Sequence, residues 1–302
     1  MGRRVKNMDL YENCHLCARN CGINRHERLG YCRETSEIFL SRAALHMWEE
    51  PPISGTNGSG TIFFSGCSLS CVFCQNADIS RGRSGRSVTI SRLAEIMLEL
   101  QHKGAHNINL VTPTHYIPSL VEAIPMARGM GLTIPIVYNT GSYDNVDALR
   151  TLSGLVDIYL PDLKYYNVKT AESYSHAGDY PTVARDAIAE MYRQVGTPIF
   201  DDDGIMRHGM IVRILLLPGR VAEAKLSLKY LIDTYGDNIY VSLMNQYTPM
   251  PDMATPLNRR VTREEYNELL DYAEKLGLKN GFTQDFGTAS ESFIPPFNCE
   301  GI

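Results

Sequence analysis

The sequence predicts an α/β fold in which six parallel strands form a partial barrel that stays open. After residue 60, short β-like runs alternate with amphipathic helical patterns, an order typical of βαβ units. Two of the runs, VDIYL (156–160) and IVRILLL (211–217), are almost wholly apolar, as parallel strands covered on both faces are. Six such strands are too few for a closed eight-stranded barrel, so an open barrel fits better.

Each predicted strand is a short run rich in apolar residues. In chain order the strands are Thr61–Phe64, Ile108–Val111, Thr133–Tyr138, Val156–Leu160, Met210–Leu217 and Ile239–Leu243. The helical patterns between them are Ser91–His102, Ile117–Met130, Asp144–Leu152, Val183–Val195 and Ala222–Thr234. Residues 196–209 interrupt this alternation, and their Asp-Asp-Asp-Gly turn predicts a small hairpin before the fifth strand.

The chain is predicted to have three parts. Residues 1–60 form a cysteine-rich extension that binds metal, residues 61–250 form the barrel, and residues 251–302 complete it. The last part contains a predicted helix over Arg263–Leu276, a short GFTQ run (281–284) and an irregular tail.

Composition excludes several classes of protein. The 302 residues are 44% hydrophobic and carry a net charge of −5, so no basic surface indicates nucleic-acid binding. No apolar run approaches the ~20 residues that span a bilayer, and the first residues lack the apolar core of a secretory signal. We therefore expect a cytoplasmic protein without membrane contact. Cytosolic thiols stay reduced, so clustered cysteines there more often bind metal than pair.

Three cysteines directly follow the first predicted strand. Cys67, Cys71 and Cys74 have the spacing C-x3-C-x2-C within GCSLSCVFCQN. Three thiolates on one loop can hold three corners of a [4Fe–4S] cube and leave the fourth iron open for a ligand. The loop also lies where parallel α/β barrels place their chemistry, at the carboxyl end of a strand.

Zinc binding and simple burial are the alternatives for these thiols. Zinc usually takes two C-x2-C pairs, and no fourth ligand lies near Cys74 in the sequence. Buried structural thiols would have no reason to follow this spacing after a barrel strand. The cluster is therefore the favoured interpretation.

With aromatic Phe73 before the last cysteine, the motif resembles the signature of the radical S-adenosylmethionine (radical SAM) superfamily. Within it, the chain is most similar to the branch of proteins that resemble pyruvate formate-lyase activating enzyme. The stretches that carry this resemblance span nearly the whole chain. They are CHLCARNC, WEEPPISGTNGSGTIFFSGC, CVFCQN, NLVTPTHY, DIYLPDLKYYN and SLMNQYTPM.

The resemblance implies a mechanism, cofactors and partners. SAM would chelate the open iron, and one-electron reduction would cleave it to a 5′-deoxyadenosyl radical that removes a hydrogen atom from the substrate. The protein would position the reactive carbon and exclude water. A flavodoxin- or ferredoxin-type donor would supply the electron, and a glycyl-radical enzyme would be a partner if the chain is an activase.

The resemblance also suggests SAM-binding residues. Phe73 would lie at the adenine, with simple packing as the alternative. Relatives often place Gly-Gly-Glu against the SAM amine at the end of the second strand, where this chain has Thr112-Pro113-Thr114-His115. The hydroxyls of Thr112 and Thr114 and the imidazole of His115 can bind the same ammonium. His115 is also a candidate catalytic residue facing the substrate, or a residue that starts a helix.

Further polar residues end the later strands. Asp162-Leu163-Lys164 matches the Asp-Leu-Lys of activating enzymes, where charged groups reach the ribose and carboxylate of SAM. Asn139 and Thr140 end the third strand, where relatives carry cofactor ligands. Arg213, in an apolar strand, needs a partner and is either a carboxylate clamp or part of a structural ion pair.

Three other residues are weaker candidates. Glu49 and Glu50, before Pro51-Pro52, can bind a substrate amine or lie in solvent, and solvent is slightly favoured. Tyr247 ends the sixth strand with Gln246, and its phenol can donate to a radical or orient substrate. Aromatic lining is the more ordinary role for Tyr247.

A second group of cysteines lies in the extension. Cys14, Cys17, Cys21 and Cys32 suffice for closed tetrahedral coordination, which would staple a segment too short to fold alone. A structural zinc is the plainer interpretation, and a second iron–sulfur cluster for electron relay is the alternative.

Three functions follow as hypotheses. The first is an activase that removes hydrogen from a backbone glycine of a glycyl-radical enzyme. The second is a radical SAM enzyme acting on a small molecule or peptide, for example an amino-acid epimerase or mutase. The third is a non-catalytic module that transfers electrons or binds a partner, against which the incomplete three-thiolate set argues. The sequence does not name the substrate.

Overall fold

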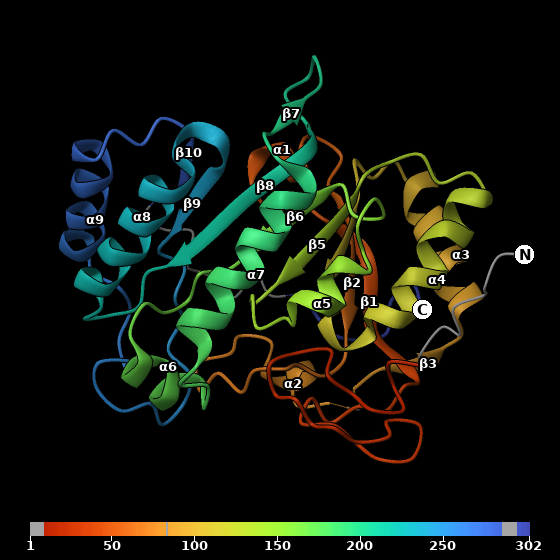
Figure 1. Ribbon diagram of the computed structural model, residues 1–302. Coiled ribbons are helices and arrows are strands. Elements are labelled where there is room, and N and C mark those ends of the chain that lie inside the picture. The colour runs from red at the N-terminus through yellow and green to blue at the C-terminus, as the bar shows by residue number, and fades with distance from the viewer. Residues whose placement is uncertain (1–8, 83, 286–294) are drawn as a thin grey trace, which may run out of the picture.

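A computed structural model describes residues 9–82, 84–285 and 295–302 (Figure 1). Its strands are β1 (Ile38–His46), β2 (Ser59–Phe64), β3 (Arg86–Val88), β4 (Ile108–Val111), β5 (Ile136–Thr140), β6 (Ile158–Pro161), β7 (Ile199–Phe200), β8 (Met206–Leu215), β9 (Tyr240–Met244) and β10 (Gly281–Thr283). Its α-helices are α1 (Pro51–Ser54), α2 (Ala77–Ser80), α3 (Ile90–His102), α4 (Ile117–Gly129), α5 (Val146–Arg150), α6 (Val168–Ser175), α7 (Tyr180–Val195), α8 (Val221–Tyr235) and α9 (Arg263–Lys275). Two 3₁₀ turns span Thr114–Tyr116 and Gly236–Asn238.

The strands form one open sheet in the order β10-β9-β8-β6-β5-β4-β2-β1-β3, with β7 paired to β8. All neighbours from β2 to β10 along this path are parallel, whereas β1 runs antiparallel to β2 and β3. The two ends of this path are not joined among the described residues, so the barrel is partial. The predicted α/β fold class is confirmed.

Helices cover the outer face of the curved sheet (Figure 1). In α3 the buried residues Leu93, Ile96, Met97 and Leu100 repeat at helical spacing and form one apolar stripe. The hydroxyl of Thr89 accepts a hydrogen bond from the Arg92 N–H and caps this helix. Helices of this kind bury the outer side of the strands and leave the inner side for the interior of the barrel.

The predicted elements agree with the structure to within a few residues. The second predicted strand coincides with β4, and the predicted hairpin exists as the antiparallel pair β7–β8. β1, β3, α1, α2 and α6 were not predicted, and the GFTQ run forms the unpredicted strand β10. β1 follows the last cysteine of the extension and is stabilised by pairing with β2, a contact between distant segments that the sequence does not show. The extension thus contributes a strand to the sheet of the barrel.

Helix α1 closes the amino-terminal end of the barrel, opposite the end where α2 lies (Figure 1). Its fully buried Ile53 packs in one apolar cluster with Val137, Ile158, Leu160 and Ile211, which point inward from β5, β6 and β8. The barrel interior is therefore filled at this end, and any site must lie between α1 and the carboxyl ends of the strands. No helix in the described ranges is long and apolar enough to cross a bilayer.

Candidate functional site

A cavity of about 350 Å³ occupies the carboxyl-terminal half of the barrel. Its walls come from the cysteine loop after β2, the ends of β4, β5 and β6, the inner side of β8 and β9, and the segment before α1. The volume lies within the ~300–1,000 Å³ of small-molecule sites. Parallel strands place their carboxyl ends together, which is why loops far apart in sequence meet here.

The cysteine loop begins at a sharp turn on Gly66. This glycine has a φ of +84°, and a Cβ there would lie 2.5 Å from Cγ of Glu34 and 2.7 Å from the Cys32 carbonyl oxygen. The turn leads Cys67, Cys71 and Cys74 to the cavity, and all three line it. The sequence thus places the three predicted iron ligands on one wall.

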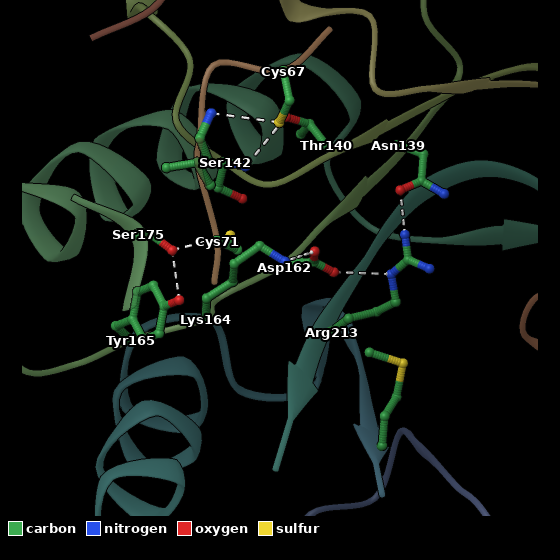
Figure 2. A network of polar contacts seen from close by, with 12 residues as sticks. Cys67, Cys71, Asn139, Thr140, Ser142, Asp162, Lys164, Tyr165, Ser175 and Arg213 are labelled. Carbon is green, nitrogen blue, oxygen red and sulfur yellow. Dashed lines mark hydrogen bonds and ion pairs between the residues drawn. The ribbon is translucent and has the colours of Figure 1, made fainter. Parts of the chain in front are cut away.

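The surroundings of these thiols fit an iron–sulfur cluster. The Leu69 N–H donates to Cys67 Sγ (3.4 Å), and the Ser175 hydroxyl donates to Cys71 Sγ (3.0 Å; Figure 2). Hydrogen bonds to ligating sulfur are a feature of such sites. Burial and the neighbouring thiols raise the pKa of Cys67 to about 12, and the Leu69 N–H and the charge of Lys164 offset this rise only in part. Bound iron would supply further compensating charge.

Ser175 is a site residue that the sequence does not predict. It ends α6, 104 residues from Cys71, and its hydroxyl also contacts the Tyr165 hydroxyl at 2.6 Å (Figure 2). A serine at the end of an amphipathic helix carries no sequence signal for such a contact.

The two predicted aromatic residues lie side by side, with ring centroids 5.9 Å apart. Phe73 is almost fully buried and lines the cavity. Tyr247 is fully buried behind it, does not line the cavity, and donates its hydroxyl to the Leu257 carbonyl at 2.6 Å. The structure thus gives the Tyr247 phenol a packing position rather than a place at the cavity.

Charged residues form a chain across the cavity wall. Lys164 Nζ lies 2.5 Å from Asp162 Oδ2, and Asp162 Oδ1 lies 3.3 Å from Arg213 Nε (Figure 2). Arg213 also donates to Asn139 Oδ1 and lies 3.2 Å from Glu49 Oε2. Burial lowers the pKa of Lys164, but the charges of Asp162 and Cys71 outweigh it and the net shift is upward. Of the two roles expected for Arg213, the structure shows the ion pair.

The preference for solvent at Glu49 and Glu50 is wrong. Glu49 is 9% exposed and Glu50 is 8% exposed, and both line the cavity. The reason is α1, which enters the barrel and carries the two preceding carboxylates inside with it. Gln246 and the exposed Trp48 line the same cavity.

The segment Thr112–His115 is only partly brought to the cavity. Thr112 lines it, whereas Thr114 is buried beside Thr140 (Oγ1–Oγ1 3.3 Å), outside the cavity wall. His115 is also buried away from the cavity, with Nε2 2.7 Å from the Ser65 carbonyl oxygen. Burial, helped by the charge of Arg25, lowers the pKa of His115 to about 3, so the ring is neutral. His115 therefore supports the turn before the cysteine loop and does not face the cavity.

The four cysteines of the extension lie close together and are linked to the cysteine loop. Burial raises the pKa of Cys17, and the thiols of Cys14, Cys21 and Cys32 raise it further. Arg19 donates to the carbonyls of Ser68 (2.9 Å) and Ser175 (3.0 Å), which fixes the extension against the cysteine loop.

Within residues 9–82, 84–285 and 295–302, no three His, Cys, Asp or Glu side chains surround a single-ion position. Zinc and a second cluster both stay open as proposals for the extension.

Metal analysis tests the extension. We expect Cys14→Ser or Cys32→Ser to lower solubility or the melting temperature, because the segment loses its staple, while the folded fraction still cleaves SAM. Cys299→Ser, a change in the tail, is the matched control. Zinc beyond the iron of one cluster would support the structural site. Iron near about eight atoms per chain, the sum of two four-iron clusters, would contradict it.

Comparisons with known proteins agree with this site. The family model of the radical SAM superfamily matches residues 61–223, more than half of the chain. The uncharacterized protein MJ0674 of Methanocaldococcus jannaschii is 30% identical over 284 residues, covering 89% of this chain and 77% of that protein.

A solved structure shares the fold. The FeFe-hydrogenase maturase HydG of Carboxydothermus hydrogenoformans is 14% identical with a TM-score of 0.51, over 72% of this chain and 50% of that one. A domain of pyruvate-formate lyase-activating enzyme from Bacteroides vulgatus is 14% identical with a TM-score of 0.40, over 57% of this chain and 91% of that domain. The chain spans about half the length of several solved structures that it matches, HydG among them.

The cysteine loop at the carboxyl end of β2, the cavity it borders and the family match point the same way. The non-catalytic module is thereby set aside. The chain belongs to the radical SAM superfamily, whose enzymes use a [4Fe–4S] cluster and S-adenosylmethionine.

Proposed function

We propose that this radical SAM enzyme removes a hydrogen atom from a small molecule or short peptide held inside the barrel. The observation that carries the proposal is the composition of the cavity wall. Trp48, Glu49 and Glu50 of the extension and Pro295 of the tail line the cavity together with the cysteine loop. Segments outside the barrel thus help enclose the cavity that a protein substrate would have to enter.

Contacts along β1 hold the tail in place. The Cys299 N–H donates to the Ser41 carbonyl (3.0 Å), and the Ala43 N–H donates to the Glu300 carbonyl (2.8 Å). Phe297 packs edge-on against Phe63, which lines the cavity, with ring centroids 5.3 Å apart. Residues 295–302 therefore cover the open side of the barrel next to β1, which favours an enclosed substrate.

The residues that line the cavity would bind the cluster and SAM. Cys67, Cys71 and Cys74 would ligate three irons, and when bound the cluster and SAM supply one-electron cleavage of the sulfonium and abstraction of hydrogen. Phe73 would lie against the adenine, and Thr112 would contact the SAM ammonium. Lys164 and Asp162 would bind the carboxylate and ribose, with Arg213 and Asn139 holding Asp162 in position. A flavodoxin- or ferredoxin-type protein would donate the electron.

A glycyl-radical-enzyme activase is the second candidate. The observation that favours it is Asp162-Leu163-Lys164, which matches the activating enzymes in sequence and lies at the cavity beside Cys71. This match concerns SAM binding, whereas the wall formed by Glu49, Glu50 and Pro295 concerns the substrate. The wall therefore supports the small substrate as the first candidate.

One experiment separates the two functions. The reduced enzyme and SAM are incubated either with glycyl-radical enzymes from the same genome or with small molecules carrying deuterium. We expect deuterium in 5′-deoxyadenosine from a small molecule and no protein glycyl signal by electron paramagnetic resonance. A glycyl signal without deuterium transfer would establish the activase.

A further inference from the structure

The charged side chains around the cavity form ion pairs with one another, except for one carboxylate that has no cationic partner among the described residues. Glu49, Arg213, Asp162 and Lys164 alternate in sign, and each neighbouring pair lies within 3.3 Å. The Asn109 side-chain amide donates to the other Glu49 oxygen at 2.8 Å. This chain of two carboxylates and two cations is neutral by itself.

Glu50 is the carboxylate that has no cation of its own. It is more than nine-tenths buried, it lines the cavity, and Oε2 has no hydrogen-bond partner among the described residues. A hydrogen bond from Ser242 and the positive field of Arg213 act on the Glu50 carboxyl, but no ion pair forms within the described ranges. Burial raises its pKa, and the charge of Glu49 raises it further.

The backbone of Glu50 is held at the cavity wall. Its carbonyl accepts hydrogen bonds from the N–H groups of Ile53 (2.8 Å) and Ser54 (3.0 Å), which start α1. Ile53 is fully buried in the barrel, so the residue before this helix is fixed at the cavity wall. An unpaired carboxylate held in such a place is unfavourable unless a ligand supplies a donor or a positive charge.

We propose that Glu50 binds a protonated amine of the substrate, so that the substrate is a small molecule carrying an ammonium group. This inference rests on the proposed function, because it assigns a recognition group within the same cavity. An ammonium offers three N–H donors and one positive charge, which match the free oxygen and the surplus negative charge. A substrate anion would meet repulsion from both Glu49 and Glu50.

The test uses a small-molecule extract from the source organism grown on deuterated medium. Half of the extract is treated with acetic anhydride, which converts amines to uncharged amides, and half is mock-treated with acetate. Reduced enzyme and SAM are incubated with each half, and deuterium in 5′-deoxyadenosine is measured by mass spectrometry. We expect deuterium transfer from the mock-treated half and its loss after acetylation.

A variant assigns the effect to Glu50. Glu50→Gln keeps the size of the side chain and removes the charge, so we expect deuterium transfer at limiting extract to fall at least about tenfold, equivalent to ~1.4 kcal/mol. Its melting temperature should be unchanged or higher, because a buried unpaired charge is removed. Glu122→Gln, on the exposed face of α4, makes the same chemical change and should transfer deuterium as the parent does.

Each contrary result has a distinct meaning. Transfer that survives acetylation, or that Glu50→Gln leaves intact, would overturn the ammonium site while the small-molecule function stands. A comparable loss of SAM affinity in Glu50→Gln would assign the carboxylate to the ammonium of SAM and also overturn the proposal. No deuterium from the mock-treated half would overturn the small-molecule function itself.

Discussion

Replacing any one of Cys67, Cys71 and Cys74 by Ala is expected to abolish reductive cleavage of SAM. All three thiols line one wall of the cavity, and a [4Fe–4S] cluster with an open iron needs each of them. The measurement is 5′-deoxyadenosine formed per chain after anaerobic reconstitution and reduction. The parent protein should also show the absorption and paramagnetic signals of a four-iron cluster, which the variants lose.

Cys299→Ala is the matched control for these variants. Cys299 lies in the tail beside Ser41 and does not line the cavity, so its removal should leave cleavage at the level of the parent. Full cleavage by any one of the three loop variants would show that its cysteine is not an iron ligand. Such a result would leave the fold intact and refute the assignment of the site.

Arg213→Met is expected to cause a large loss of stability, about 3–5 kcal/mol, the cost of removing one partner from a buried charge pair. Arg213 is 11% exposed and lies between Glu49 and Asp162, with Glu50 close enough to feel its charge. Met keeps the apolar stem of the side chain but leaves these carboxylates without their shared cation. The measurement is the midpoint of anaerobic urea unfolding.

The same strand offers a control for this change. Arg207 pairs with Asp201 at 2.8 Å, but its side chain is 45% exposed, and exposed pairs contribute about 0–1 kcal/mol. Arg207→Met should therefore shift the midpoint little. If the two variants shift the midpoint equally, the charged residues at the cavity are not a buried network. The case for an unpaired negative charge on Glu50 would then fail.

Much of the fold was predictable because its signals are local. The apolar runs of β6 and β8 and the stripe of α3 each follow from a few neighbouring residues. The cysteine spacing is equally local, since one loop carries all three thiols. The contact of Asp162 with Lys164 also follows from their separation of two residues.

Other features depended on pairing or packing between distant segments. β1 pairs with both β2 and β3, and this pairing between segments far apart in the sequence stabilises β1 and β3. Ser175 reaches Cys71 only because α6 ends beside the cysteine loop. Residues that act through such contacts were therefore absent from the predicted site.

The sequence by itself determined the α/β class, the order of the main strands and helices, and the three thiols that identify the superfamily. Each of these features depends on residues within a short segment of the chain. The tertiary structure decided which candidates meet. Burial of α1 in the barrel turned Glu49 and Glu50 inward, while packing against Ser65 and Leu257 drew His115 and Tyr247 away from the cavity. The physical reason is that the burial of each side chain depends on how all the strands and helices of the barrel pack together, and no single segment of the sequence specifies that packing.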